Sequence, residues 1–399
     1  MAFLKGLFVI LLLTIFGYAK AQEALSKDSV LPDSSNFVTA SLIAISPGSE
    51  IYSVFGHCAL RMECPSEGLD VCFSLEVEPS AISFLLGKEN TKFVSVETEE
   101  YLSHFREEGR SISQCILNLS VSEKQELGKL FYYELENQTI RRFNLKTNDC
   151  LSALMLRIES VMKNEQMEFR QIPSIMNQNN GDVVRYFSEK NPWSEFLIMT
   201  FAGNEADGHY DVDYKLSPEI MPSMLQHALI RNLNSGKVRP AIIGNPIILH
   251  EKSCEVNKSI ISPLAVFLGV LLLVIVITFF EIFAGWKLLP RITDALLFFF
   301  QTIVGLILIR TTFFSGIFDS HWNWYLIPFN IIPFIVWICF RKKKNFGKVY
   351  IIYAAVLAVF VLMTPFISQL DWTHQLISLT FLTRCINKYV ELKKSYNEK

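Results

Sequence analysis

Hydrophobic and polar residues alternate over short stretches in the front part of the chain, residues 22–260. Such period-two runs, separated by turn residues such as Pro47-Gly48-Ser49, predict β-strands with one buried face. The pattern therefore predicts a soluble domain built on a β-sheet. Strands are expected at 39–46, 57–62, 71–77, 93–97 and 111–119.

Apolar residues at helical spacing occur between these strands. Ser120 and Glu123 have the spacing of a capping box, which predicts the start of one helix. Ser217-Pro218 predicts the start of another. Strands and helices together predict an α+β fold. Helices are expected at 120–136, 150–162 and 217–233.

After residue 260 the apolar runs become too long for the core helices of a soluble protein. They predict an all-α bundle of five transmembrane helices within residues 261–399, a region that ends in a cytoplasmic tail. The spans are expected at 263–283, 292–314, 324–340, 349–367 and, with a weaker signal, 375–389.

The first 21 residues have the parts of a secretory signal peptide. Lys5 precedes an apolar run over 6–17, and Ala19-Lys20-Ala21 places small residues at the spacing that signal peptidase reads. Cleavage before Gln22 leaves no N-terminal Cys on the mature chain. The alternative is a retained membrane anchor, for which the apolar run is short.

Composition and charge narrow the class of protein. Of the 399 residues, 50% are hydrophobic and 19% are charged, which excludes a disordered or small disulfide-rich protein. The formal net charge is -2, whereas nucleic-acid binding needs a clustered excess of Lys and Arg. We therefore expect the membrane, and no nucleic acid, as a partner.

Cys150 and His57 are candidates for thiol chemistry. Cys150 follows Thr147-Asn148-Asp149 and begins a predicted helix, where free backbone N–H groups favour a thiolate and could form an oxyanion hole. His57 begins a strand after Gly56 and could serve as the base. The alternative is a buried Cys at a helix start and a strand His bonded to a carbonyl.

A resemblance gives these two residues a context. Residues 46–61 (SPGSEIYSVFGHCALR) and Asn148-Asp149-Cys150 resemble the Lnb family of bacterial lipoprotein N-acyltransferases. Members have a signal peptide, a periplasmic thiol-dependent domain with a permuted papain-like (NlpC-type) fold, and a bundle of membrane helices. The order of His before Cys fits the permuted fold. Two segments after the second span also resemble the family, Phe314-Ser315-Gly316 and Asn323-Trp324.

The resemblance implies a multi-pass protein of the bacterial inner membrane whose soluble domain lies in the periplasm. It would move an acyl chain from a phospholipid donor to the α-amino group of the lipid-modified N-terminal Cys of lipoproteins. Cys150 would form a thioester, with His57 as base and then acid, and the acceptor amine would resolve it in a ping-pong sequence. Neither a cofactor nor a metal is expected.

Two positions depart from the family pattern. The family usually has Asn directly before the nucleophile, whereas here Asp149 stands between Asn148 and Cys150. An anionic neighbour raises a thiol pKa unless its charge points away. On the strand after the hairpin the family commonly has Asn, where this chain has Ser74. Either Ser74 or Asp70 would then orient the histidine.

The candidate site residues follow. The catalytic candidates are Cys150, His57, Ser74 as the orienting residue, and Asn148. The substrate-binding candidates are Arg61, four residues after the histidine, together with Arg310 and His321. A charge at the depth of Arg310 usually has a partner, such as a lipid phosphate; a side chain that snorkels to the interface is the alternative.

Two further groups have competing explanations. Cys64 and Cys72 bracket a predicted hairpin turn and are the best disulfide candidates, with two reduced thiols as the alternative. Residues 209–213 (HYDVD) include metal-ligand types, but in a Gly-flanked loop we expect a solvated turn.

Two other functions compete with the acyltransferase. A membrane-anchored papain-like cysteine peptidase or amidase of the cell envelope would use the same thiol, but a soluble substrate needs no five-helix platform. A non-catalytic envelope sensor would keep the fold, but it would not need both His57 and Cys150.

The distribution of Lys and Arg predicts the topology. Cations follow the first and third predicted spans and fill the tail, whereas 316–323 and 368–374 contain none. By the positive-inside rule the C-terminus is cytoplasmic, and the soluble domain is outside together with the two uncharged loops. A reporter fused after Lys399 should be active in the cytoplasm, and a reporter active only in the periplasm would contradict this topology.

Overall fold

The computed structural model describes residues 39–48, 53–77, 90–145, 147–170, 179–208, 217–253, 261–317, 320–335, 347–367 and 369–397. Contacts divide the chain into two compact units. One is drawn from Met1–Gln178 and Tyr210–Asn257, and the other from Asn179–His209 and Lys258–Lys399. The predicted signal peptide and the loop at 209–213 lie outside the described residues.

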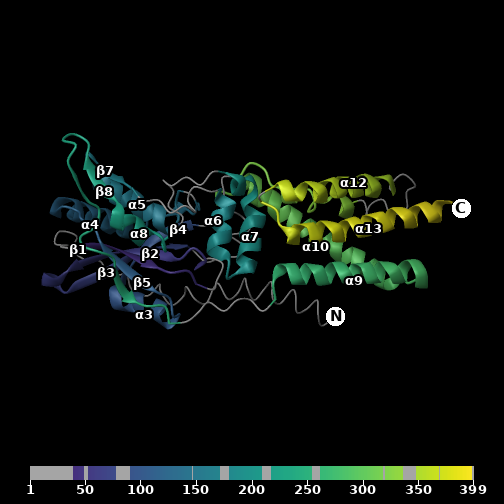
Figure 1. Ribbon diagram of the computed structural model, residues 1–399, viewed down its shortest axis with the longest axis horizontal. Helices are drawn as coiled ribbons and strands as arrows, with labels where there is room; N and C mark the ends of the chain where they lie inside the picture. Colours follow the sequence, from purple (N-terminus) through teal and green to yellow (C-terminus); the bar gives the residue numbers. More distant parts are fainter. Residues whose placement is uncertain are drawn as a thin grey trace. The chain divides into compact units, whose positions relative to one another are not determined.

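An antiparallel sheet of seven strands forms the centre of the first unit (Figure 1). Its order is β10-β5-β1-β2-β3-β4-β6, so β1 to β4 follow one another as a meander. The five predicted strands are confirmed as β1 to β5. The bounds are β1 Thr39–Ile45, β2 His57–Cys64, β3 Leu69–Val77, β4 Asn90–Glu97, β5 Ile112–Ile116, β6 Arg141–Arg142 and β10 Ile247–His250.

Helices pack on both faces of this sheet. α4, α5 and α8 lie against one face, and α3 lies against the other. Phe73, Phe93 and Phe131 fill the core on the α5 side, where the Phe131 ring centroid is 4.8 Å from that of Phe73. The bounds are α3 Thr98–Glu107, α4 Val121–Glu136, α5 Cys150–Val161 and α8 Met221–His227.

Two of the predicted helices form where expected. α4 begins at the capping box, in which the Glu123 N–H donates to Ser120 Oγ (3.3 Å). The Ser120 N–H in turn donates to the Glu123 carboxylate (2.6 Å). α5 begins at Cys150, as the sequence predicts.

The third predicted helix, 217–233, is wrong in its second half. α8 ends at His227, and Leu229–Asn232 forms strand β8. This strand pairs with β7 (Glu165–Glu168) on one edge and β9 (Val238–Pro240) on the other. The strand prevails because both edges find hydrogen-bond partners while Ile230 still enters the core.

The predicted disulfide between Cys64 and Cys72 does not form. Cys64 packs in the core on the α5 side of the sheet, whereas Cys72 packs on the α3 side. Side chains on opposite faces cannot be bridged without moving the backbone. Cys64 Sγ instead lies 3.3 Å from Ser66 Oγ, and Cys72 Sγ lies 3.5 Å from Thr98 Oγ1.

The turn before β2 requires glycine at position 56. Its φ of +89° is one that other residues rarely adopt, and a Cβ there would lie 2.5 Å from the Ile45 carbonyl oxygen. The Gly56 N–H donates to the Ser53 carbonyl (2.9 Å). The turn therefore fixes where β2 begins, with His57 paired to Ile45.

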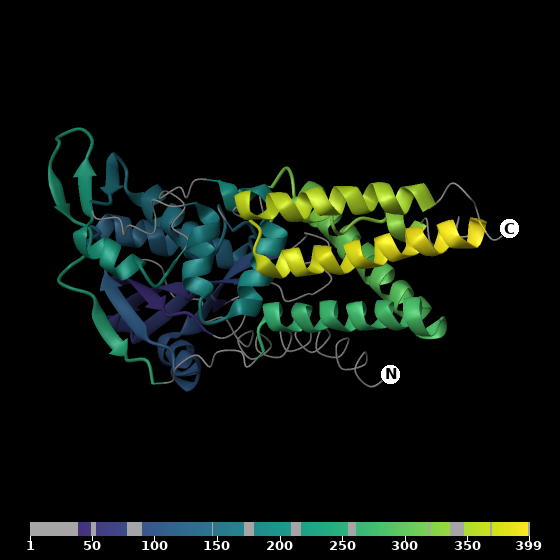
Figure 2. The ribbon, with the colours of Figure 1, turned by 45° about the vertical axis from the view of Figure 1, so that its right-hand side comes forward.

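The second unit is helical, and α12 and α13 run side by side in it (Figure 2). Three of its helices, Pro263–Ala284, Leu288–Phe314 and Lys348–Phe366, are long and apolar enough to cross a membrane. They correspond to the first, second and fourth predicted spans. The bounds are α6 Asn180–Ser188, α7 Pro192–Ala202, α9 Pro263–Ala284, α10 Leu288–Phe314, α12 Gly347–Met363 and α13 Trp372–Asn397.

The described residues thus provide three candidate spans rather than the five predicted. The predicted third span, 324–340, is described only as far as residue 335. The predicted fifth span falls within α13, whose 26 residues are enough to cross a bilayer. Because α13 carries charged residues, including Arg384 and Lys388, it is less apolar than the three candidate spans and is not counted among them.

These charges of α13 are paired inside the helical unit. Arg384 Nε donates to Asp294 in α10 (2.6 Å), and Arg384 Nη1 donates to Glu281 in α9 (2.8 Å). Lys388 Nζ lies 2.8 Å from the other Asp294 oxygen. Arg384 and Asp294 are fully buried, so the pairs replace the water that these charges have lost.

Residues 179–208 belong to the second unit, although the sequence assigned them to the soluble domain of residues 22–260. Phe196 of α7 packs against Phe267 of α9, with ring centroids 5.5 Å apart. Asn204 Oδ1 accepts hydrogen bonds from the N–H groups of His321 and Trp322, both at 2.9 Å. The apolar α7 is therefore part of the helical unit.

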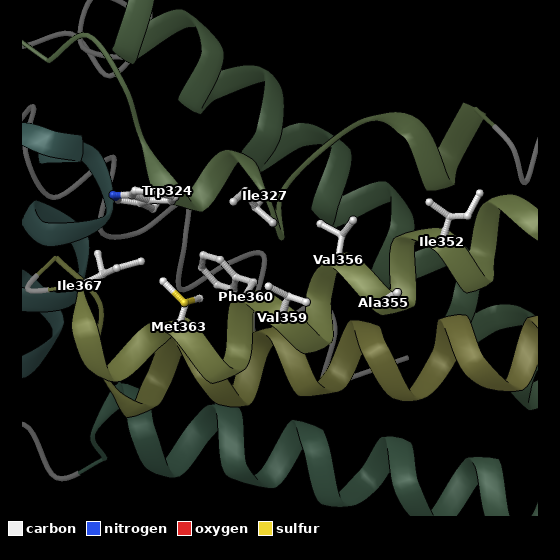
Figure 3. A pocket seen from close by; sticks show the side chains of 9 residues that line it. All are labelled: Trp324, Ile327, Ile352, Ala355, Val356, Val359, Phe360, Met363 and Ile367. Carbon is white, nitrogen blue, oxygen red and sulfur yellow. The ribbon is translucent and has the colours of Figure 1, made fainter.

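An apolar groove of about 470 Å³ follows α12 (Figure 3). Trp324 and Ile327 line one side of it, and Val356, Phe360 and Met363 project from α12. The lining consists of hydrophobic side chains, which suits a helix in contact with membrane hydrocarbon.

Replacing Gly56 with Ala should destabilise the protein more than replacing Gly236 with Ala. Both glycines have positive φ, so each substitution adds about 1–2 kcal/mol of backbone strain. Only at Gly56 does the new Cβ meet a backbone oxygen, because nothing lies within 4 Å of it at Gly236. Thermal unfolding of the full-length protein measures both losses, and equal losses would contradict the steric argument.

Candidate thiol site

Cys150 is the first residue of α5 and follows Asp149, which caps the helix. Its side chain packs against the core between α5 and the sheet. Among the cysteines that the structure describes, Cys150 alone is not fully buried. A thiol at a helix start that stays accessible is in a position that favours the thiolate.

The Cys150 thiol interacts with the first two residues of β2. It hydrogen-bonds with the His57 side chain, the Cys58 thiol and the Cys58 backbone. The backbone contact lowers the thiol pKa, so the Cys58 N–H is the donor. The turn at Gly56 thus places two consecutive residues, His57 and Cys58, in contact with the Cys150 sulfur.

These contacts hold the pKa of Cys150 well below its usual value. The hydrogen bond from Cys58 has the largest effect; the charge of His57 and its hydrogen bond act in the same direction, against burial. Burial raises the pKa of Cys58 well above its usual value, and Cys150 raises it further. Of the two thiols, Cys150 therefore has the lower pKa, and Cys58 is the one that donates its proton in their hydrogen bond.

The His57 ring contacts the Ser74 hydroxyl. His57 Nε2 lies 2.9 Å from Ser74 Oγ, which leaves Nδ1 for Cys150. Ser74 is buried in β3, so this contact is shielded from water. Asp70, the other candidate for this role, pairs with Arg61 and accepts a hydrogen bond from the Thr98 hydroxyl (2.6 Å). The geometry therefore favours Ser74.

Two residues near His57 did not emerge from the sequence. Burial raises the pKa of Glu76, while the charges of Lys92 and His57 lower it. The Glu76 carboxylate therefore interacts electrostatically with His57. Glu76 is two residues after Ser74 on one strand, a spacing that places both on one face. Tyr101, whose buried hydroxyl lies near Ser74, comes from α3, for which no helix was predicted.

Asp149 occupies the N–H groups that were expected to form an oxyanion hole. Its Oδ1 accepts hydrogen bonds from the N–H groups of Leu151 (2.8 Å) and Ser152 (2.7 Å). Burial, followed by the neighbouring Cys150 charge, raises the pKa of Asp149 well above its usual value. The hydrogen bonds from Ser152 and Leu151 act in the opposite direction and lower the Asp149 pKa.

Asn148 holds the loop before Cys150. Its amide donates to Thr91 Oγ1 (2.9 Å) and to the Arg142 carbonyl (2.8 Å). Both amide protons are therefore engaged, and Asn148 cannot donate one to an oxyanion at Cys150.

Arg61, expected to bind substrate, is engaged within the protein. Its guanidinium makes a bidentate pair with Asp70 (2.8 and 2.6 Å) and donates to Gln114 (3.0 Å). It also lies 2.9 Å from a Glu63 carboxylate oxygen. These contacts tie β2 to β3 and β5, so the arrangement gives Arg61 a structural role.

Arg310 and His321 belong to the second unit, whereas Cys150, His57 and Ser74 belong to the first. Arg310 Nη1 donates to the Phe314 carbonyl at the end of α10 (3.0 Å), and its guanidinium lies over the Phe314 ring. His321 is exposed, and its N–H donates to Asn204. These contacts match the interfacial arginine that was the alternative for Arg310.

The arrangement can support nucleophilic catalysis. It combines an ionisable thiol, a histidine within hydrogen-bonding reach and a third group that orients the histidine. Among the described residues no group of three or more His, Cys, Asp or Glu side chains could hold a metal ion. Sequence analysis did not identify Cys58 as a hydrogen-bond partner of Cys150, because nothing in the sequence indicates that the start of β2 contacts the start of α5.

The sequence matches two family profiles. The profile described as the Lnb N-terminal periplasmic domain matches residues 23–182, and that of the Lnb transmembrane domain matches residues 255–395. No curated protein and no solved structure matches the chain.

Removing the Cys58 thiol should make Cys150 less reactive at low pH. In Cys58→Ala the thiolate of Cys150 loses a hydrogen bond, so its pKa should rise and the pH profile of alkylation should move to higher pH. Cys58→Ser, which keeps an O–H donor, should retain the original profile, and Cys115→Ala serves as a control. Mass spectrometry of the Cys150 peptide gives the rates; an unshifted profile in Cys58→Ala would rule out this role.

Proposed function

The chain belongs to the Lnb family, and from this premise we propose that it is a lipoprotein N-acyltransferase. It is a membrane protein with a periplasmic domain. The proposed reaction moves an acyl chain from a phospholipid to the α-amino group of the lipid-modified N-terminal Cys of a lipoprotein. The observation that carries the proposal is the contact between His57 and a Cys150 thiol of lowered pKa.

In the first half-reaction the Cys150 thiolate attacks the carbonyl carbon of a phospholipid ester. A C–S bond forms, and the C–O bond to the lysophospholipid breaks as the tetrahedral intermediate collapses. Protonated His57 gives its proton to the departing oxygen. The products are a lysophospholipid and a thioester at Cys150.

In the second half-reaction the α-amino group of the acceptor attacks the thioester carbonyl. The C–N bond forms, the C–S bond breaks, and His57 takes the proton that the amine loses. The acylated lipoprotein leaves, and Cys150 returns to the thiolate. One histidine thus serves as acid in the first half and as base in the second.

The neighbouring groups support these steps. Since Asp149 uses the N–H groups of Leu151 and Ser152, the Cys150 N–H would donate to the oxyanion, and the Cys58 N–H, which donates to the thiolate at rest, would join it once the C–S bond has removed the thiolate charge. Ser74 would fix the orientation of His57 through the 2.9 Å contact.

We further propose the complete topology and fold implied by family membership. The soluble domain would be a permuted papain-like domain, because a histidine on a strand precedes a cysteine at a helix start. The membrane part would have five spans in the inner membrane, and α13 would be the last. The pairing of Arg384 with Asp294 and Glu281 makes such a span tolerable.

A membrane-anchored peptidase or amidase would use the same thiol and histidine. The helical unit favours the acyltransferase, because phospholipid and lipoprotein both reside in the membrane whereas a soluble peptide does not. Family membership supports the same choice.

The full-length protein incubated with phospholipid and no acceptor should gain the mass of one acyl chain on Cys150, and hydroxylamine should remove it. Cys150→Ala should abolish transfer because no thioester can form, His57→Ala should lower transfer by about 10²–10⁴-fold, and the double variant should lose little more than Cys150→Ala alone. Ser74→Ala should lower transfer less. Cys72→Ala, which removes a buried thiol on the other face of the sheet, is the matched control.

Cells that lack this protein should accumulate lipoproteins with a free α-amino group, which mass spectrometry of their N-termini detects. Acyl transfer that persists in Cys150→Ala would contradict the proposal. Cleavage of an envelope peptide through Cys150, without any acyl-enzyme, would favour the peptidase.

A further inference from the structure

A pocket lined by three arginines lies beside the loop that leads to Cys150. Its volume is about 380 Å³, and residues of α4, α5 and β6 form its walls. Arg141, Arg142 and Arg157 line it together with a single carboxylate, that of Glu134. The lining therefore has an excess of positive charge.

Glu134 cannot neutralise all three arginines. Its two oxygens accept a bidentate pair of hydrogen bonds from Arg141 (3.0 and 2.9 Å), and Arg157 Nη2 also donates to both of them (3.2 and 3.4 Å). The Arg142 side chain is exposed and makes no hydrogen bond or ion pair with any residue that the structure describes.

Arg157 is buried and incompletely paired. Only 5% of the residue is exposed, and its guanidinium lies over the Phe93 ring at 4.9 Å. Nη1 donates to the Ala153 carbonyl (2.9 Å), but Nε has no acceptor among the described residues. A buried N–H without an acceptor is costly, and Arg157 in the pocket wall can still donate a hydrogen bond from Nε although Nη2 is paired with Glu134.

We propose that this pocket binds a phosphate group. Guanidinium groups pair with phosphate through planar, bidentate hydrogen bonds, and here they come from two separate elements, β6 and α5. Phosphate presents oxygens on several sides, which suits such donors better than the single plane of a carboxylate. Thr147 and Ser160 also line the pocket, and their hydroxyl groups donate to Asn144 Oδ1 (3.0 Å) and to the Arg157 carbonyl (2.7 Å).

The identity of the phosphate rests on the proposed function. Arg142 is tied to the loop before the nucleophile, because its carbonyl accepts the Asn148 amide (2.8 Å). Asn148 lies two residues before Cys150, so their Cα atoms are at most about 7 Å apart. A glycerophospholipid with its ester at Cys150 could therefore place its phosphodiester here. A free phosphate ion is the other source of this chemistry.

Binding to the full-length protein in an uncharged, phosphate-free detergent tests the proposal. The probes are inorganic phosphate, dihexanoylphosphatidylglycerol and dihexanoylglycerol, which lacks phosphate. A phosphate-bearing probe should raise the unfolding temperature, while dihexanoylglycerol should not. Arg142→Gln should weaken that binding by about tenfold or more. Arg106→Gln, in α3 on the other face of the sheet, should leave it unchanged.

The outcomes separate the two sources. Arg142-dependent binding of the phospholipid identifies a headgroup site, and Arg142-dependent binding of inorganic phosphate alone identifies a site for the free ion. Equal affinities in Arg142→Gln and wild type for both phosphate probes overturn the inference, and acyl transfer through Cys150 would then still stand. If transfer is absent but phosphate binding depends on Arg142, the proposed function fails and the pocket remains a phosphate site.

Discussion

A thiolate inside a folded protein needs hydrogen-bond donors in place of the water that it has lost. At Cys150 these donors come from β2, through Cys58 and His57, because Asp149 has taken the nearest N–H groups of the helix. The site therefore depends on one strand meeting one helix. The Gly56 turn fixes the residue at which β2 begins and so fixes the positions of His57 and Cys58 relative to Cys150. A shift of β2 by one residue would move each of these two side chains to the opposite face of the sheet.

The parts of the fold with strong local signals were predictable. Alternation gave β1 to β5, and a capping box gave the start of α4. The β7–β8–β9 sheet was not predicted, because its pairing joins residues 165–168 to 229–232 across a long stretch of chain. The assignment of 179–208 to the helical unit rests on packing that no local pattern reports.

The residues of the thiol site likewise include some that the sequence predicts and others that only the structure reveals. The sequence identified Cys150, His57 and Ser74, and the structure brings the three together. It also proposed Asn148 and Arg61, whose polar groups are consumed by neighbouring strands and loops. Sequence analysis did not identify Cys58 or Arg157, because their roles depend on contacts with residues far away in the sequence, Cys150 and Glu134 respectively. Residue type and spacing show which groups are present, but not which of them already have partners.

The buried charges of the helical unit imply an order of assembly during synthesis. In an isolated membrane helix, Arg384 and Lys388 of α13 would each cost about 2.5–3.5 kcal/mol to insert. Arg384 pairs with carboxylates of α9 and α10, and Lys388 pairs with Asp294 of α10 besides Glu391 of its own helix; α9 and α10 leave the ribosome first. In the proposed five-span topology, α13 would be the last span and would enter the bilayer against helices already in place. A chain truncated before α13 would leave Asp294 without Arg384 and Lys388, the cations that pair with it.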